Sequence, residues 1–188
     1  DGTLIEAWAS QKSFQPKDGG PSGPTSGGDG RNEDVDYRGQ KRSNDTHAST
    51  TDPDARLSKK SKGGEARLSY MGHVLMENRS GLVVQHSLSI SSGTAEPEAA
   101  VQMVKEIPGN YRITVGMDKG YDRASCVEEL RQLNATPHVA QRKVYSAVDG
   151  RTVNSPGYLI SQRVRKRVEE IFGWMKTVGG YRKTRFRV

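Results

Sequence analysis

Regular hydrophobic patterns begin at Ala66 and continue to the end of the chain, whereas the residues before it are mostly polar. From Pro16 to Asp34 the sequence is dominated by Gly, Pro, Ser, Asp and Asn, a composition that cannot bury a core and is typical of a flexible loop. A short apolar run precedes this loop and indicates a first strand or tight turn: Leu4, Ile5, Ala7 and Trp8. We therefore predict a first strand followed by a long, largely irregular insertion at 10–65.

Beyond Ala66 the apolar spacing alternates between the strand period of two and the helix period of 3.6. The pattern predicts a hairpin with strands at 66–76 and 82–90, a helix between Thr94 and Pro108, a strand at 112–117, a helix at about 123–133, a strand at 136–140, a loop at 141–157 and a helix at 161–178. This order favours an α/β fold, with a mixed sheet flanked by helices. At 188 residues, a single domain with one insertion is the simplest organisation.

The charge balance points to an anionic partner. Twenty-nine basic residues stand against 22 acidic ones, for a net charge of +7. Such a surplus favours an anionic partner such as nucleic acid over a basic ligand or partner. No apolar run approaches the roughly 20 residues of a membrane span, and no signal peptide opens the chain, so we expect a cytoplasmic protein without a membrane partner.

Cys126 is the only cysteine, which excludes an intrachain disulfide and a cysteine zinc site and fits a reducing compartment. Its position on a predicted helix favours a small buried residue over a nucleophile. The chain starts at Asp1 without an initiator Met. We expect a fragment of a longer product, with an upstream DNA-binding region missing.

Three carboxylates stand where they could meet. Asp1 lies at a strand edge, Asp118 directly follows a predicted strand, and Glu169 lies in the middle of the last helix. Oxygen ligands that converge at a sheet edge suit Mg²⁺ or Mn²⁺, and two such ions about 3.5–4 Å apart can serve phosphodiester chemistry. Taken singly, an aspartate at a strand end is more often a turn or cap residue.

Cations surround the last of these carboxylates. Arg165, Glu169 and Lys176 are spaced by four and seven residues, so on a regular helix they share one face. This is either an ordinary helix salt bridge or a metal ligand flanked by two phosphate-binding cations. Four further candidates for phosphate contact are Lys119, beside Asp118, and three residues of the basic tail, Arg182, Lys183 and Arg185, although the tail could also be plain solvated charge.

The remaining polar and aromatic candidates have ordinary alternatives. The four histidines, His47, His73, His86 and His138, lack a paired ligand spacing, so a zinc site is not expected; His73 alone could approach the Asp1 strand. Asp122 is expected to cap the helix that follows it. Trp174 could stack on an unpaired base or pack in the core.

Three segments match a known set of motifs in the right order. They are Asp1-Gly-Thr, Gly116-Met-Asp-Lys-Gly-Tyr-Asp122 and Arg163–Lys176. Together they resemble the bacterial insertion-sequence DDE transposases, in the group named after insertion sequences four and five. The resemblance extends through His47–Leu57 and Thr177–Arg187. In the last motif Gln162 stands where that family has Tyr.

The resemblance implies an RNase H-like catalytic domain in which Asp1, Asp118 and Glu169 bind two Mg²⁺ (or Mn²⁺) ions. It also implies DNA as the partner, at the transposon ends and the target. In this family water attacks the phosphodiester at the element end, and the freed 3′-hydroxyl then attacks target DNA. A homodimer in the synaptic complex and a bacterial, nucleoid-associated location follow from the same resemblance. Two alternatives are an RNase H-like nuclease without strand transfer and a DNA-binding remnant without activity.

Overall fold

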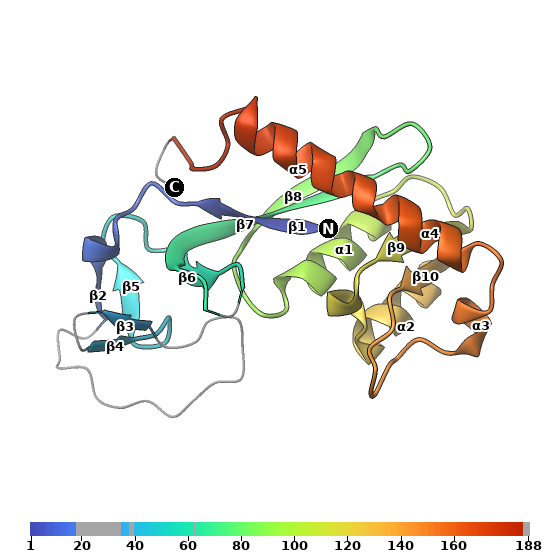
Figure 1. Cartoon of the computed structure of the whole chain (residues 1–188), viewed down its shortest axis with the longest axis horizontal. Coiled ribbons are helices and arrows are strands. Elements are labelled where there is room, and N and C mark those ends of the chain that lie inside the picture. The colour runs from blue at the N-terminus through green and yellow to red at the C-terminus, as the bar shows by residue number, and fades with distance from the viewer. Residues whose placement is uncertain (18–34, 38–39, 62, 186–188) are drawn as a thin grey trace. The chain divides into compact units, whose positions relative to one another are not determined.

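The structure is a computed structural model that describes residues 1–17, 35–37, 40–61 and 63–185 (Figure 1). Most of the glycine-rich stretch predicted as a flexible loop lies outside these residues. The chain divides into two compact units. The first comprises Asp1–Gly2, His73–Ser87 and Glu96–Trp174, and the second comprises Thr3–Gly72, Leu88–Ala95 and Met175–Val188.

The first unit contains the predicted run of helices and strands. The elements are α1 (Ala95–Lys105), β9 (Ile113–Met117), α2 (Ala124–Gln132), β10 (Ala135–Val139), α3 (Gly150–Val153), α4 (Tyr158–Val164) and α5 (Val168–Thr177), whose last residues belong to the second unit. Strands β9 and β10 pair in parallel, with Ile113 opposite Ala135 and Met117 opposite Val139 (Figure 1). The strand, helix and strand at 112–140 are thus confirmed as a β-α-β unit.

The core of the first unit lies between the parallel pair and its helices. Most of its buried side chains come from α1, β9, α2 and β10: Ala100, Val104, Val115, Met117, Cys126, Val127, Leu130, Ala135 and Val139, joined by Tyr121 of the 3₁₀ turn after β9 and by Val148. Cys126 is 1% exposed on α2, as its helix position predicted. Burial of this apolar stripe fixes α2 against the sheet and, with it, the loop that leaves β9.

The predicted hairpin is also confirmed. Strand β7 (Ala66–Met76) pairs with β8 (Val83–Ile90), and Gly81 between them has a φ of +76° that favours glycine. Strands β1 (Gly2–Glu6) and β6 (Arg56–Lys59) pair with β7 in the same four-stranded sheet. The sequence predicted one mixed sheet, whereas among the described strands β9 and β10 form a parallel pair that is separate from this sheet.

The second unit contains what is described of the predicted insertion. Short strands occur within 10–65: β2 (Phe14–Pro16), β3 (Val35–Tyr37), β4 (Gln40–Arg42), β5 (His47–Ser49) and β6. Strand β2 pairs with β5, and β3 pairs with β4, both antiparallel. Their small core is formed by Ala7, Phe14, Ala55, Leu57, Ala66, Leu68 and Tyr70.

Two helical predictions need correction. The helix expected at 161–178 begins at Tyr158 and is interrupted by a 3₁₀ turn at Arg165–Arg167 that separates α4 from α5. The loop expected at 141–157 contains α3, which Asp149 caps through a hydrogen bond from the Arg151 backbone nitrogen (3.2 Å). Short polar capping motifs like this one carry no hydrophobic period, so the spacing of apolar residues does not detect them.

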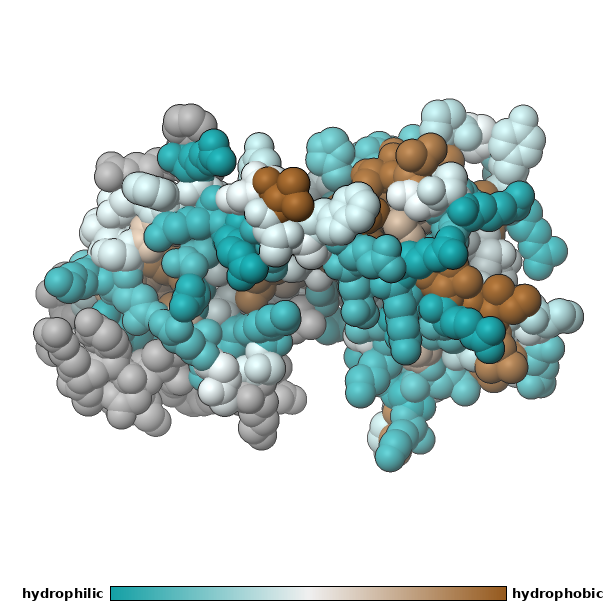
Figure 2. Space-filling model, turned by 45° about the horizontal axis from the view of Figure 1, so that its top comes forward, coloured by the Kyte–Doolittle hydropathy of each residue, from teal (hydrophilic) through white to brown (hydrophobic). Residues whose placement is uncertain are grey.

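Hydrophobic residues are scattered among hydrophilic ones on the face in view in Figure 2. Several lie on α4 and α5, where Leu159, Ile160 and Trp174 are 77%, 65% and 72% exposed. Trp174 therefore does not pack in the core. Within the described part of the chain, every helix is too short or too polar to cross a membrane.

Candidate active site

Asp118 lies at the point where β9 ends. It caps the 3₁₀ turn at Lys119–Tyr121, and its Oδ1 accepts a hydrogen bond from the Gly120 backbone nitrogen (2.6 Å). The turn therefore fixes the half-buried carboxylate. Because β9 and β10 are parallel, Asp118 stands at their carboxyl end, where α/β proteins usually bind ligands.

Asp1 is held to strand β7 by its backbone. Its nitrogen donates to the Val74 carbonyl, and the Val74 nitrogen donates to the Asp1 carbonyl, both at 2.9 Å. Such a mutual exchange is the hydrogen-bonded pair of an antiparallel ladder. The Asp1 Oδ1 also accepts from the Gly2 backbone nitrogen (2.9 Å). The position of this carboxylate is thus set by pairing with β7.

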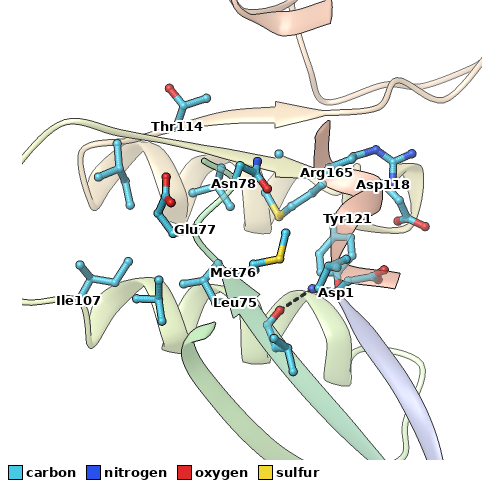
Figure 3. A pocket seen from close by; sticks show the side chains of 17 residues that line it. Asp1, Leu75, Met76, Glu77, Asn78, Ile107, Thr114, Asp118, Tyr121 and Arg165 are labelled. Carbon is cyan, nitrogen blue, oxygen red and sulfur yellow. Dashed lines mark hydrogen bonds between the residues drawn. The ribbon is translucent and has the colours of Figure 1, made fainter. Parts of the chain in front are cut away.

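One cavity brings the two aspartates together. It has a volume of about 170 Å³, and its apolar walls come from β7, β9 and the neighbouring helices. Asp1, Asp118 and Arg165 lie toward one end of it in Figure 3, while Glu77 and Ile107 lie toward the other. Tyr121, which is 2% exposed, lines the cavity beside Asp1. Of the three carboxylates that the sequence analysis singles out, Asp1 and Asp118 thus line the same cavity.

Two hydrogen bonds link Arg165, which lines this cavity, to strand β10. Its Nε donates to Gln162 Oε1 (3.0 Å), and Gln162 Nε2 donates to the His138 carbonyl on β10 (2.5 Å). A Cβ at Gly116 would lie 3.4 Å from both Arg165 Cβ and the Ser161 carbonyl oxygen. The end of α4 thus packs closely on β9, and Gln162 ties Arg165 to the parallel pair.

Glu169 is not among the residues that line the cavity. It is exposed on α5, and its neighbour Val168 is buried and lines the cavity instead. The predicted common face of Arg165 and Glu169 assumed a regular helix, but the 3₁₀ turn advances by 3.0 rather than 3.6 residues per turn and shifts their relative direction. Among the described residues, no three His, Cys, Asp or Glu side chains gather closely enough to hold a metal.

Two aspartates nevertheless fit a magnesium-type ion. Mg²⁺ commonly uses one or two carboxylates, with waters and substrate phosphates as its remaining ligands. Asp1 and Asp118 each have one oxygen oriented by a backbone N–H, which limits the rotation of the carboxylate. The guanidinium of Arg165 supplies a cation at the same cavity, where it can bind a phosphate group bidentately.

The other predicted phosphate-binding residues differ in their surroundings. Lys119 is exposed, next to Asp118. In the second unit, Lys176 Nζ donates to Thr3 Oγ1 (2.6 Å), and burial lowers the pKa of Lys176, an effect to which Lys60 and Arg182 contribute. Lys176 is thus a half-buried amino group with an internal partner.

Several residues of the basic tail form contacts within the second unit. The Glu6 nitrogen donates to the Arg182 carbonyl (3.0 Å), and the Thr184 nitrogen donates to the Glu6 carbonyl (2.8 Å). Lys183 Nζ lies 3.6 Å from Glu6 Oε1 and 5.2 Å from the centroid of the Trp8 ring. Arg182 and Arg185 remain exposed. Of the three basic tail residues, Lys183 is the least available for phosphate contact, because it already has an anionic and an aromatic neighbour.

Asp122 has a role that differs from the predicted helix cap. It is 1% exposed, and its two oxygens accept from the backbone nitrogens of Arg142 (2.7 Å) and Ala147 (2.8 Å). Helix α2 begins after Arg123 without a side-chain cap. Asp122 therefore anchors both ends of the loop that follows β10. The sequence does not reveal this role, because the two partners lie 20 and 25 residues away along the chain.

The described histidines do not form a metal site. His73 is 2% exposed, is not among the cavity residues, and burial lowers its pKa to about 4. The ring of His138 lies between Ser161 Oγ (2.8 Å from Nδ1) and Ser155 Oγ (3.1 Å from Nε2). His138 is thus a buried residue of β10 whose two ring nitrogens both have hydrogen-bond partners.

In a comparison with known families, the chain matches the model of the transposase DDE domain over residues 44–187. The matched range includes Asp118, Arg165 and Glu169, and Asp1 lies outside it. No curated protein and no solved structure matches the chain significantly. Since the family model covers most of the chain, including the β9 end that carries Asp118, the chain belongs to the transposase DDE domain family.

Proposed function

We propose that this chain is the catalytic domain of a DNA transposase that cleaves phosphodiesters at element ends and joins them to target DNA. The observation that carries the proposal is the common cavity of Asp1, Asp118 and Arg165 at the carboxyl end of β9. Membership of the transposase DDE family supports the same reaction class, a phosphoryl transfer. We further propose an RNase H-like single domain with an insertion at 10–65, of the group named after insertion sequences four and five.

In this proposal Asp1 and Asp118 hold divalent metal, Mg²⁺ or Mn²⁺, and Glu169 is a further ligand. The metal, as one or two ions, would activate the attacking oxygen and stabilise the leaving oxygen. Arg165 binds the scissile phosphate, and the Gln162 bond orients its guanidinium. The apolar walls of the cavity exclude water from the other side of the bound group.

DNA is the proposed partner, with transposon ends and target bound by a homodimer in a cytoplasmic, nucleoid-associated complex. The surplus of basic residues supports this assignment. Lys119, Lys176, Arg182, Lys183 and Arg185 are the proposed further phosphate contacts. Trp174, exposed on α5, is available to stack on a base.

The test is an activity measurement on the purified chain with linear DNA that carries candidate element ends. Products that are cleaved and joined only in the presence of Mg²⁺ or Mn²⁺ would support the proposal. Cleavage without joining would instead indicate a nuclease, and binding without either reaction would indicate a remnant. Asp118→Asn should abolish both reactions without unfolding the chain, because it removes the negative charge of a proposed metal ligand.

Glu169 has a matched control in its neighbour. Glu169 and Glu170 are both exposed in the first turn of α5, so Glu169→Gln and Glu170→Gln make the same change in charge at adjacent positions. If Glu169 is a metal ligand, only its variant loses activity and requires more metal. Equal activity of the two variants would exclude this ligand while leaving the two aspartates in place.

A further inference from the structure

A second cavity lies at the opposite end of the parallel pair from Asp118. It has a volume of about 240 Å³, and its lining includes Arg112, just before β9, and Thr136, near the start of β10. A single water needs only about 10–15 Å³ measured in this way, so the cavity has room for a polyatomic group. It belongs entirely to the first unit, and none of its lining residues contributes to the Asp118 cavity.

Three arginines from three different parts of the first unit line this second cavity. Arg112 precedes β9, Arg131 lies in the last turn of α2, and Arg151 lies in α3. Asp149 forms ion pairs with Arg131 (3.2 Å) and with Arg151 (2.6 Å). Three guanidinium groups and this one carboxylate leave a net charge of about two positive units. Like charges around one cavity repel each other, and a bound anion would relieve that repulsion.

Hydrogen bonds orient the arginines while most of their N–H groups are left for other acceptors. Arg151 donates to Asp149 Oδ2 through Nε (2.9 Å) and Nη2 (2.6 Å). Arg131 Nη2 donates to Asp149 Oδ1 and to Thr152 Oγ1 (3.5 Å). Each guanidinium has five donors in a rigid planar fork, so these bonds fix the group without exhausting it.

Arg112 completes the set from the strand side. Its Nε donates to Thr136 Oγ1 (3.4 Å), which directs the guanidinium along the start of β10. Arg112 and Arg151 are exposed, and Arg131 is half-buried. An anion can therefore enter from solvent and meet cations from several sides.

We propose that Arg112, Arg131 and Arg151 form a site for a phosphate group at the amino ends of β9 and β10. A tetrahedral dianion or phosphodiester matches the forked donors of arginine better than a chloride ion does. The DNA backbone is the source that the proposed function would supply, and to that extent the inference rests on it. A free phosphate or a small phosphorylated molecule offers the same chemistry and is distinguished by experiment.

The first arm of the test uses inorganic phosphate alone. The Nε–H signals of the arginines are followed by NMR during titration with phosphate, and chloride at matched ionic strength serves as the reference. Saturable shifts of Arg112 and Arg151 with phosphate only are expected. The result does not depend on cleavage, so it stands even if the Asp118 cavity proves inactive.

The second arm uses duplex DNA and the double variant Arg112→Gln/Arg151→Gln, with Lys105→Gln as a control for the loss of a positive charge outside both cavities. Lys105 is exposed at the end of α1 and lines neither cavity. If the group comes from DNA, the double variant binds DNA with a salt slope smaller by about 0.9 for each lost phosphate contact. Arg131 is left in place because, unlike the exposed Arg112 and Arg151, it is half-buried.

The outcomes separate cleanly. A reduced slope in the double variant, with Lys105→Gln unchanged, assigns the site to DNA. Saturable phosphate shifts with an unchanged slope assign it to a small phosphorylated molecule. The proposal is overturned if phosphate produces no saturable shift and the double variant binds DNA like the Lys105 control. Circular dichroism of each variant confirms that the fold is retained.

Discussion

Gln162 accepts a hydrogen bond from Arg165 Nε at 3.0 Å and at the same time donates to the His138 carbonyl. An amide can do both because it carries an acceptor oxygen and a donor nitrogen. A phenol in its place could not form the same two bonds with separate atoms. Gln162, which stands where the motif that this segment resembles has Tyr, therefore links Arg165 to β10 through two hydrogen bonds.

Replacement of Gln162 by Leu should weaken the function of Arg165 without removing its charge. Loss of one hydrogen bond predicts a reduction of about two- to tenfold in cleavage rate, whereas Arg165→Gln should cost about 10- to 150-fold. The double variant should be no worse than Arg165→Gln, because the two residues act as one unit. Single-turnover cleavage measures all three, with Arg163→Gln, an exposed neighbour on α4, as control. Additive losses would show that Gln162 does not act through Arg165.

Asp122→Asn should release the loop after β10. The carboxylate accepts from two backbone N–H groups, while an asparagine side chain offers one oxygen and directs an NH₂ group at the other donor. The expected loss is about 1–3 kcal/mol in the free energy of unfolding, measured by urea denaturation. The Arg142 and Ala147 amides should also exchange hydrogen faster. Unchanged exchange at both amides would contradict the anchoring role.

Cys126 should be inert toward alkylation in the native protein. The thiol is buried in the core of the first unit, and burial raises its pKa to about 11, an effect to which nearby Glu129 adds. Since the thiolate is the nucleophile, iodoacetamide at neutral pH should label the denatured chain and leave the native chain unlabelled. Mass spectrometry measures the labelling. Rapid labelling of the native chain would show that α2 opens frequently.

Glu77 should remain ionised to low pH. Ser80 donates to it through Oγ (2.6 Å) and through its backbone nitrogen (2.7 Å), as does the Arg79 nitrogen (3.0 Å), and these bonds lower the pKa of Glu77 to about 2. Because the pKa of Glu77 is lower in the folded chain than the unfolded value of 4.5, its ionised carboxylate stabilises the turn at pH values above 4.5. This stabilisation is lost as the pH falls toward 2. A carboxyl ¹³C titration measures it. A midpoint near 4.5 would contradict the turn geometry.

The sequence predicts the position of Asp118 well because the neighbouring signals are local. A β-branched strand ends just before it, and glycines on either side permit a tight turn, as the structure confirms with β9 and the following 3₁₀ turn. The order of the helices and strands from Ala66 to Val139 is predictable for the same reason. Each amphipathic segment carries its own period.

Features that depend on distant partners are not predictable in this way. Glu169 does not line the cavity, and the 3₁₀ turn that precedes it changes the direction of its side chain. The apolar spacing of the last predicted helix is unbroken and does not indicate this turn. The role of Asp122 depends on two loop nitrogens far along the chain, and the arginine cavity gathers residues from a strand end, a helix end and a short helix. Only the tertiary packing brings such groups together.

The parallel pairing of β9 with β10 sets a fixed length scale for the first unit. The extended stretch from Arg112 to Asp118 spans about 20 Å at the usual rise of a strand. Along one DNA strand the same length corresponds to about six nucleotides. If a DNA backbone reached from the arginine cavity to Asp118, the length of β9 would decide which phosphate lies at the carboxylates. An insertion or deletion in β9 would therefore place a different phosphate there.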